Sequence, residues 1–82
     1  MYTYTKNDYA ILRAIRNAKS ELISITIKSL QEETKLSTVK IRKTLKLFLN
    51  EGYVKQGIPK IKAKTFYITQ EGINKLKEVM GG

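Results

Sequence analysis

The stretch that decides the fold is residues 25–54, ITIKSLQEETKLSTVKIRKTLKLFLNEGYV. Apolar residues recur in it at three- and four-residue spacing, which is the period of an amphipathic helix. The pattern is interrupted at KLS, where Ser37 is a residue type that caps the first turn of a helix. Gly52 follows the last apolar helical position and suits a left-handed C-terminal cap. The stretch therefore predicts two helices joined by a short turn.

The flanking segments complete one small domain. Upstream, Thr5 is a plausible cap with Asp8 three residues on, and a short extended piece precedes residue 27. The opening MYTYT fits either a short strand or an arm. Downstream, two β-branched and aromatic runs bracket GIPKIKA and predict a hairpin, after which Thr69 caps a last helix. Within the single domain 1–82, the predicted elements are helices at about 6–19, 27–34, 38–51 and 70–80 and a hairpin at about 53–69.

The predicted core combines these helical stripes with aromatic residues of the hairpin. We expect the aromatic side chains to pack in the core and the sheet rather than to stack on bases. The stripes are Ile11, Leu12, Ile15 and Ala18, then Ile27 and Leu30, then Ile41, Leu45, Phe48 and Leu49, then Ile73, Leu76, Val79 and Met80, and the hairpin adds Tyr53, Phe66 and Tyr67.

Positive charge is concentrated in one part of the chain. The sequence has 16 Lys and Arg against 7 Asp and Glu, a formal net charge of +9. Residues 35–64 hold nine cations and one acid, Glu51, for a net of +8, whereas the other 52 residues have a net of +1. A clustered excess of this size predicts a polyanionic partner. The nine cations are Lys35, Lys40, Arg42, Lys43, Lys46, Lys55, Lys60, Lys62 and Lys64.

The predicted helix 38–51 carries four of these cations opposite its apolar stripe. Three like-charged pairs stand three or four residues apart, which costs the helix about 1 kcal/mol in total. We expect this repulsion to be relieved when phosphates replace water around the side chains. The outer side contains Val39, Lys40, Arg42, Lys43 and Lys46.

The composition argues against several classes of protein. The chain has no cysteine and no histidine, which removes disulfides, the usual zinc ligands and the commonest acid/base side chain near neutral pH. Its seven acids are scattered and it has no glycine-rich phosphate loop, so we expect no enzyme, metal or cofactor. No run resembles a signal peptide or a membrane span, and we expect a cytoplasmic protein with no membrane partner.

The order helix, short strand, helix, helix, strand, strand, helix resembles the winged helix-turn-helix family. The resemblance covers residues 4–80 and implies an α+β fold with a three-helix core, a short first strand, a two-stranded wing and a C-terminal helix. One departure has a local consequence: Lys35 stands where the family often has glycine, and a lysine at positive φ costs about 1 kcal/mol. The spacing that carries the resemblance is Leu36-Ser37, Ile41, Leu45, Phe48, Gly52 and Val54, followed by FYITQEG.

The candidate DNA contacts follow from the shape of the duplex. The major groove of B-DNA, about 12 Å wide, accepts one helix, so the cationic helix predicts a base-reading element. Arg42 is the best candidate for guanine, and Val39 for a thymine methyl group. Ser37 and Thr38 are helix caps that could also donate to a phosphate. Lys40 and Lys43 are expected to reach base edges, Lys46 the backbone, and Lys60, Lys62 and Lys64 of the wing the neighbouring minor groove or its phosphates.

Several alternatives remain open from the sequence. A small transcriptional regulator and a protein that binds an origin or transfer site of a plasmid or mobile element use the same chemistry. The fold also serves as a protein-interaction or RNA-binding module. With double-stranded DNA as partner, the chain is expected to act as a monomer or a weak homodimer, with the tyrosine-rich N-terminus, the last helix and Leu47 as candidate subunit contacts.

Overall fold

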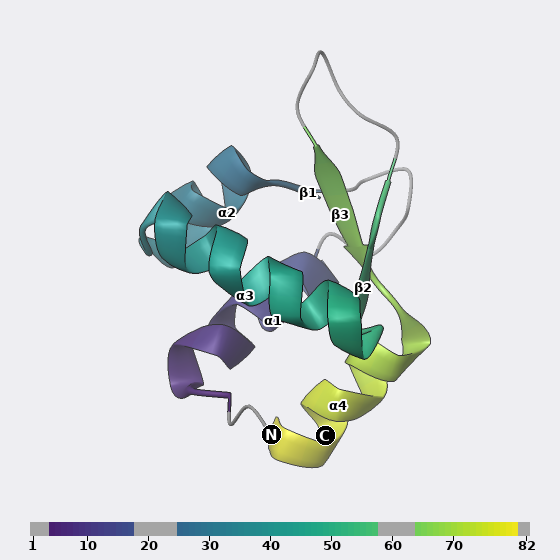
Figure 1. The fold of residues 1–82 in the computed structure, drawn as a ribbon. Coiled ribbons are helices and arrows are strands. Elements are labelled where there is room, and N and C mark those ends of the chain that lie inside the picture. Colours follow the sequence, from purple (N-terminus) through teal and green to yellow (C-terminus); the bar gives the residue numbers. More distant parts are fainter. Residues whose placement is uncertain (1–3, 18–24, 58–63, 81–82) are drawn as a thin grey trace.

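The structure is a computed structural model that describes residues 4–17, 25–57 and 64–80. It has the predicted order of elements, with the second helix beside a small sheet and the last helix below it (Figure 1). The bounds predicted for the second, third and last helices agree with those observed. The elements are α1 Lys6–Asn17, β1 Ile25–Thr26, α2 Ile27–Thr34, α3 Thr38–Glu51, β2 Val54–Gln56, β3 Thr65–Ile68 and α4 Gln70–Met80.

Some sequence predictions fall outside the described residues. These are the last part of the predicted first helix, the extended residue 24, the start of MYTYT and the tip of the hairpin, residues 58–63. Within the described part, Tyr4 and Thr5 belong to no strand. The Tyr4 ring instead lies on the core, with its centroid 5.2 Å from that of Phe48 and 6.0 Å from that of Tyr53.

The first helix begins at the predicted cap. The carboxylate of Asp8 accepts a hydrogen bond from the backbone N–H of Thr5 (2.8 Å), and the hydroxyl of Thr5 accepts one from the backbone N–H of Asp8 (3.3 Å). This reciprocal pair is a capping box, which satisfies two N–H groups that have no partner inside the helix.

The turn between α2 and α3 adopts the predicted strained conformation at Lys35. Its φ is 63°, and its N–H bonds to the carbonyl oxygen of Gln31 at 2.8 Å, which is the αL type of C-cap. The hydroxyl of Thr34 donates to the carbonyl of Leu30 (2.7 Å) and accepts from the N–H of Leu36 (3.3 Å). Ser37 then caps α3 by accepting from the N–H of Lys40 (3.2 Å). Side chains and backbone together thus hold this three-residue turn.

The end of α3 is joined to the start of α4. Gly52, at φ 80°, and Tyr53 donate to the carbonyl oxygens of Leu49 and Phe48, so the helix ends in a Schellman motif. The hydroxyl of Thr69 donates to the carbonyl of Gly52 (2.6 Å) and accepts from the N–H of Gly72 (3.1 Å). Thr69 therefore caps α4, as predicted, and ties it to the loop after α3.

The sheet has three antiparallel strands in the order β1-β3-β2. On one side of β3, Ile25 pairs with Phe66, and on the other side Gln56 pairs with the same residue. The strand that carries one arm of the hairpin is therefore also bonded to the residues that lead into α2.

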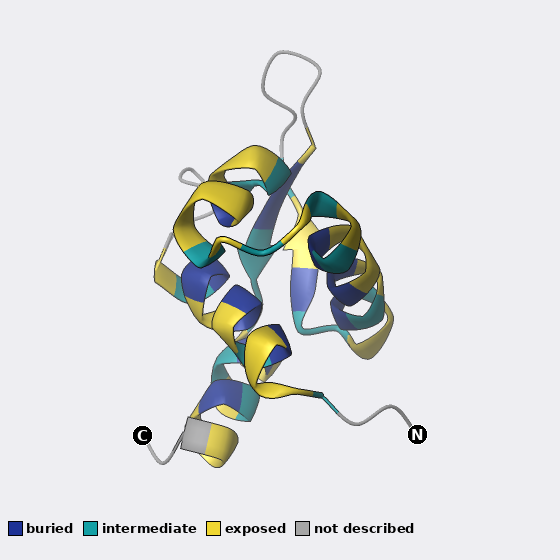
Figure 2. Ribbon diagram, turned by 90° about the vertical axis from the view of Figure 1, so that its left-hand side faces the viewer, coloured by how far each residue is buried: buried dark blue, intermediate teal, exposed yellow. Residues whose placement is uncertain are grey.

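One core fills the space between the helices and the sheet. In Figure 2 the buried residues lie on the facing sides of the helices and along β3. Where their side chains are described, the predicted stripes are buried or half-buried, with Ile27, Leu49 and Ile73 in the half-buried group, except at Val79 near the end of α4, which is 44% exposed, so its predicted burial is wrong. The buried apolar residues are Ile11, Leu12, Ala14, Ile15, Ile25, Leu30, Ile41, Leu45, Phe48, Val54, Phe66 and Leu76.

Candidate nucleic-acid interface

The outer face of α3 is a continuous exposed stripe of mostly basic residues. Its members follow one another at three- and four-residue spacing, so they share one side of the helix. Val39 stands among them with 76% of its surface exposed, although a valine gains free energy from burial. An exposed apolar side chain between cations suits contact with a base edge. The stripe consists of Val39, Arg42, Lys43, Lys46 and Asn50.

Lys40 does not belong to this stripe, so the prediction that all four cations share the outer surface is wrong for Lys40. Its Nζ lies 2.6 Å from Oδ1 of Asp8, and the Asp8 side chain is completely buried. Since successive residues turn by about 100°, Lys40 lies about a quarter turn round from Val39, on the side toward α1. A buried carboxylate requires a partner, and Lys40 supplies it.

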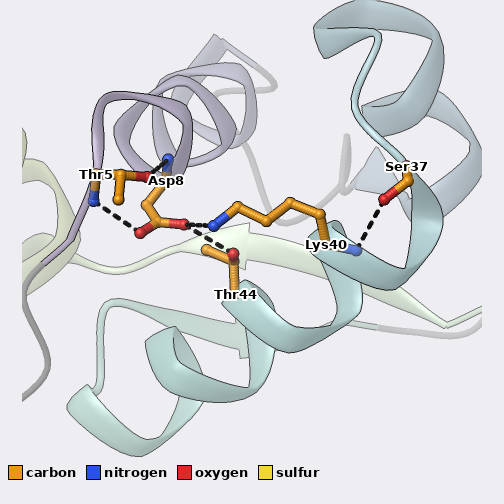
Figure 3. A network of polar contacts seen from close by, with 5 residues as sticks. All are labelled: Thr5, Asp8, Ser37, Lys40 and Thr44. Atoms are coloured by element: carbon orange, nitrogen blue, oxygen red, sulfur yellow. Dashed lines mark hydrogen bonds and ion pairs between the residues drawn. The ribbon is translucent and has the colours of Figure 1, made fainter.

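A second hydrogen bond from α3 reaches the same oxygen. The hydroxyl of Thr44, itself buried, donates to Oδ1 of Asp8 at 2.9 Å. Figure 3 shows Lys40 and Thr44 approaching the Asp8 carboxylate from α3, while Thr5 contacts it from the start of α1. The network joins the start of α1 to the first two turns of α3.

The N-terminus of α3 is free to meet an anion. Ser37 is exposed, its hydroxyl is engaged with the N–H of Lys40 as a cap, and Thr38 is half-buried. The first N–H groups of a helix and its dipole favour negative charge. The capping role predicted for Ser37 is confirmed, while a phosphate contact by either residue stays a prediction.

A groove of about 950 Å³ lies between α3 and the sheet. Buried Leu45 and Phe66 form part of its lining. Four exposed cations also line it, two from α3, one from the first turn of α2 and one from the residue before β3. No acidic residue of the described part lines the groove, so it suits an extended anion. The four cations are Lys28, Arg42, Lys46 and Lys64.

The hairpin contributes further charge at its base. Lys55, on β2, and Lys64 are exposed. Lys60 and Lys62, which were predicted to contact the minor groove or phosphates, lie outside the described residues. The contacts expected of the three wing lysines therefore stay a prediction.

Sequence reasoning missed three contributors to this surface and its support. Lys28 and Gln56 line the groove, but they belong to α2 and β2 rather than to α3, and only the fold brings them there. Thr44 was not singled out, although it stands four residues after Lys40, on the same side of the helix. That spacing, together with an acid in the first turn of α1, was an available signal.

Two further observations bear on the kind of site. None of the helices in the described ranges is both long and apolar enough to cross a membrane. Among the same residues, no three acids come together in a way that could hold a metal ion.

Comparison with known proteins agrees with the charge pattern. No family model matches the sequence. A protein named DNA-binding protein TubR, from Clostridium botulinum C phage, is 43% identical over 77 residues, which cover 92% of this chain and 95% of that protein. The chain belongs to the TubR family. The likeness extends over nearly the full length of both proteins, so it includes α3, the turn before it and the hairpin.

Solved structures of TubR proteins have the same fold. The solution structure of the DNA-binding TubR fragment from Clostridium botulinum superposes with a TM-score of 0.76 at 40% identity and covers 95% of this chain and 99% of that chain. TubR from Bacillus megaterium pBM400 gives a TM-score of 0.81 at 21% identity, with 98% and 90% covered. At that lower identity the likeness concerns the fold alone. The chain is a winged helix-turn-helix protein, as its sequence resemblance implied, and the hairpin is the wing.

Proposed function

We propose that this protein binds double-stranded DNA with sequence preference, as a small transcriptional regulator. In this arrangement α3 is the recognition helix in the major groove, and the wing lies over the adjoining backbone and minor groove. The exposed, mostly basic stripe on α3 is the observation that carries the proposal. Membership of a family whose phage relative is named a DNA-binding protein supports it. Such a protein acts in the cytoplasm, where the DNA is.

The recognition helix supplies the base contacts in this proposal. Arg42 can bond two acceptors of a guanine at once, and Lys43 can reach the neighbouring base edge. Val39, with 76% of its surface exposed, is placed for the methyl group of a thymine. The helix therefore favours a site that contains both a guanine and a thymine within its reach.

The groove between α3 and the sheet supplies the phosphate contacts. Lys46 and Arg42 line it from α3, and Lys28 and Lys64 line it from α2 and the strand side. A DNA strand that borders the major groove passes between a recognition helix and a wing, so its phosphates would meet these cations. The complete set of proposed contacts is Ser37, Thr38, Val39, Arg42, Lys43, Lys46, Lys60, Lys62 and Lys64, with Lys28 added by the structure.

One observation favours a second version of this function. The 43% identical relative comes from a phage. A binding site on a mobile element, such as an origin or transfer site, would need the same surface and the same base contacts. The sequence and position of the bound DNA distinguish this version from a regulator of a promoter.

The proposal is tested by selecting bound duplexes from a random DNA pool and titrating the protein with the selected and a shuffled duplex. We expect affinity for the selected duplex to exceed that for shuffled DNA by at least 10³-fold at physiological salt. The stoichiometry of the same titration distinguishes a monomer from a weak homodimer. Equal affinity for all duplexes, or tighter binding to RNA of the same sequence, would refute the proposal.

A further inference from the structure

We infer that Asp8 is a positioning residue for the recognition helix, which sets the rotation of α3 about its axis and keeps Lys40 away from DNA. The inference rests on the proposed function, because it concerns how α3 is presented to a duplex. Under this inference Lys40 has a structural role and does not contact DNA.

The geometry of the network supports a positioning role. Lys40 and Thr44 are one helical turn apart, and both bond to the same atom, Oδ1 of Asp8, at 2.6 and 2.9 Å. Two hydrogen bonds from one side of a helix to the same carboxylate oxygen resist rotation of the helix about its axis. A single hydrogen bond would not. The opposite oxygen, Oδ2, is held by the N–H of Thr5, so the attachment point itself is fixed to the start of α1.

The location of the network links it to base reading. Lys40 lies in the first turn of α3, next to Val39 on one side and Arg42 two residues on. The first turns of a recognition helix are the part that enters the groove. A small rotation there moves the tips of Arg42 and Lys43 away from base edges, while leaving them close enough to attract phosphates. Sequence preference should therefore depend on Asp8 more than general affinity does.

The pairing also removes one charge from the DNA-binding surface. Each cation that neutralises a phosphate makes the slope of log K against log salt more negative by about 0.9. Because Lys40 is neutralised by a completely buried carboxylate, it should contribute nothing to this slope. A lysine released from Asp8 would regain a full exposed charge in the first turn of α3.

The experiment compares Lys40→Met with Lys43→Met, which removes an exposed lysine from the same helix. Each variant is titrated with shuffled duplex DNA over a range of salt concentrations and with the selected duplex. Asp8→Asn, which keeps the shape of the side chain, and the double variant Asp8→Asn/Lys40→Met complete the set. Thermal unfolding checks that each variant is folded.

The expected results separate the two lysines. Lys43→Met makes the slope less negative by about 0.9, Lys40→Met leaves it unchanged, and Asp8→Asn makes it more negative by about 0.9 because Lys40 is released. The double variant returns to the wild-type slope. The ratio of selected to shuffled affinity falls about tenfold in Asp8→Asn and in Lys40→Met. A protein that only lost stability would show none of these slope changes.

A slope change in Lys40→Met equal to that in Lys43→Met would overturn the inference, since Lys40 would then be a DNA contact. An unchanged affinity ratio in Lys40→Met and Asp8→Asn would overturn the positioning role. If Asp8→Asn does not fold, Thr44→Val replaces it, with an unchanged slope and a severalfold lower ratio expected. If the wild type prefers no duplex, the proposed function is refuted instead. The salt slopes on shuffled DNA would still decide whether Lys40 contacts phosphates.

Discussion

Gly72, in the first turn of α4, lies directly against the backbone carbonyl of Tyr53. A Cβ atom on Gly72 would overlap the Tyr53 carbonyl oxygen and would lie 2.7 Å from Cγ1 of Ile68. The same junction includes the hydrogen bond from the N–H of Thr69 to the carbonyl oxygen of Tyr53, at 2.9 Å. The start of the last helix is therefore packed against the backbone that leads from α3 into the wing, with no room for a side chain.

We expect Gly72→Ala to destabilise the protein. Alanine favours a helix over glycine by about 1 kcal/mol, but overpacking against a fixed backbone costs about 1–3 kcal/mol or more, and here the obstacle is backbone. The net loss in the free energy of unfolding should be about 1–2 kcal/mol, measured by urea denaturation. Lys77→Ala, at an exposed position of the same helix, is the control and should change stability by less than about 0.5 kcal/mol.

Replacement of Lys35 by glycine should stabilise the protein. Lys35 is the one non-glycine residue with positive φ in the described part of the chain, at 63°. Glycine removes a strain of about 1–2 kcal/mol but adds about 0.4–1 kcal/mol of unfolded-state entropy, so a net gain of up to about 1 kcal/mol is expected. Lys35→Gln removes the charge and keeps the strain. Equal stability of the two variants would contradict the assignment of strain.

The hydroxyl of Tyr4 should ionise at a higher pH than that of an ordinary tyrosine. Burial, with a smaller contribution from the negative charge of Glu51, raises the pKa of Tyr4 from 10.0 to about 12. The folded state thus binds this proton more tightly than the unfolded state, and stability is lost as the pH rises from 10 towards 12. Tyr4→Phe should abolish this loss of stability at alkaline pH. The ultraviolet absorbance of tyrosinate is recorded for wild type and variant during an alkaline titration, and the difference between the two curves follows the ionisation of Tyr4.

The basic residues of α3 and those of the wing should contribute differently to DNA binding, the first to sequence preference and the second to general affinity. Arg42→Ala/Lys43→Ala should remove most of the preference for the selected duplex, because each lost base contact costs about 1–3 kcal/mol of discrimination. Lys60→Ala/Lys62→Ala should weaken binding to selected and shuffled DNA about equally. Fluorescence anisotropy with both duplexes provides the comparison. Loss of preference in the wing variant alone would show that the wing reads the sequence.

The salt dependence of wild-type binding tests the electrostatic part of the proposal. If about six cations meet phosphates, log K should fall against log salt with a slope near −5. The measurement needs only shuffled duplex DNA at several salt concentrations. A slope close to zero would mean that the concentrated charge between residues 35 and 64 does not contact a polyanion.

Features that depend on neighbouring residues were predictable from the sequence. The caps at Thr5, Ser37, Gly52 and Thr69 each follow from residue type and short-range spacing, whereas the positive φ of Lys35 was expected only from the family resemblance. These signals place most helix ends at the residue observed, because capping involves groups only three or four positions apart.

Features that depend on distant segments were not predictable. A helical wheel drawn for α3 alone counts Lys40 as an outer residue, because the wheel contains no information on the carboxylate 32 positions earlier that pairs with it. Val79 has the right spacing for a core stripe but lies where the core has ended. Lys28 joins the groove because β1 places the start of α2 beside β3. In each case the deciding partner is set by topology.

The position of β3 between its two neighbours has a mechanical consequence. Since β3 is hydrogen-bonded both to the other arm of the wing and to the strand that precedes α2, the base of the wing cannot shift independently of the helices beside it. The separation between α3 and the base of the wing, the two elements proposed to contact DNA, is thus built into the protein. Duplexes whose minor-groove width and curvature already match that separation would bind at lower deformation energy, so bases that touch no side chain would influence affinity.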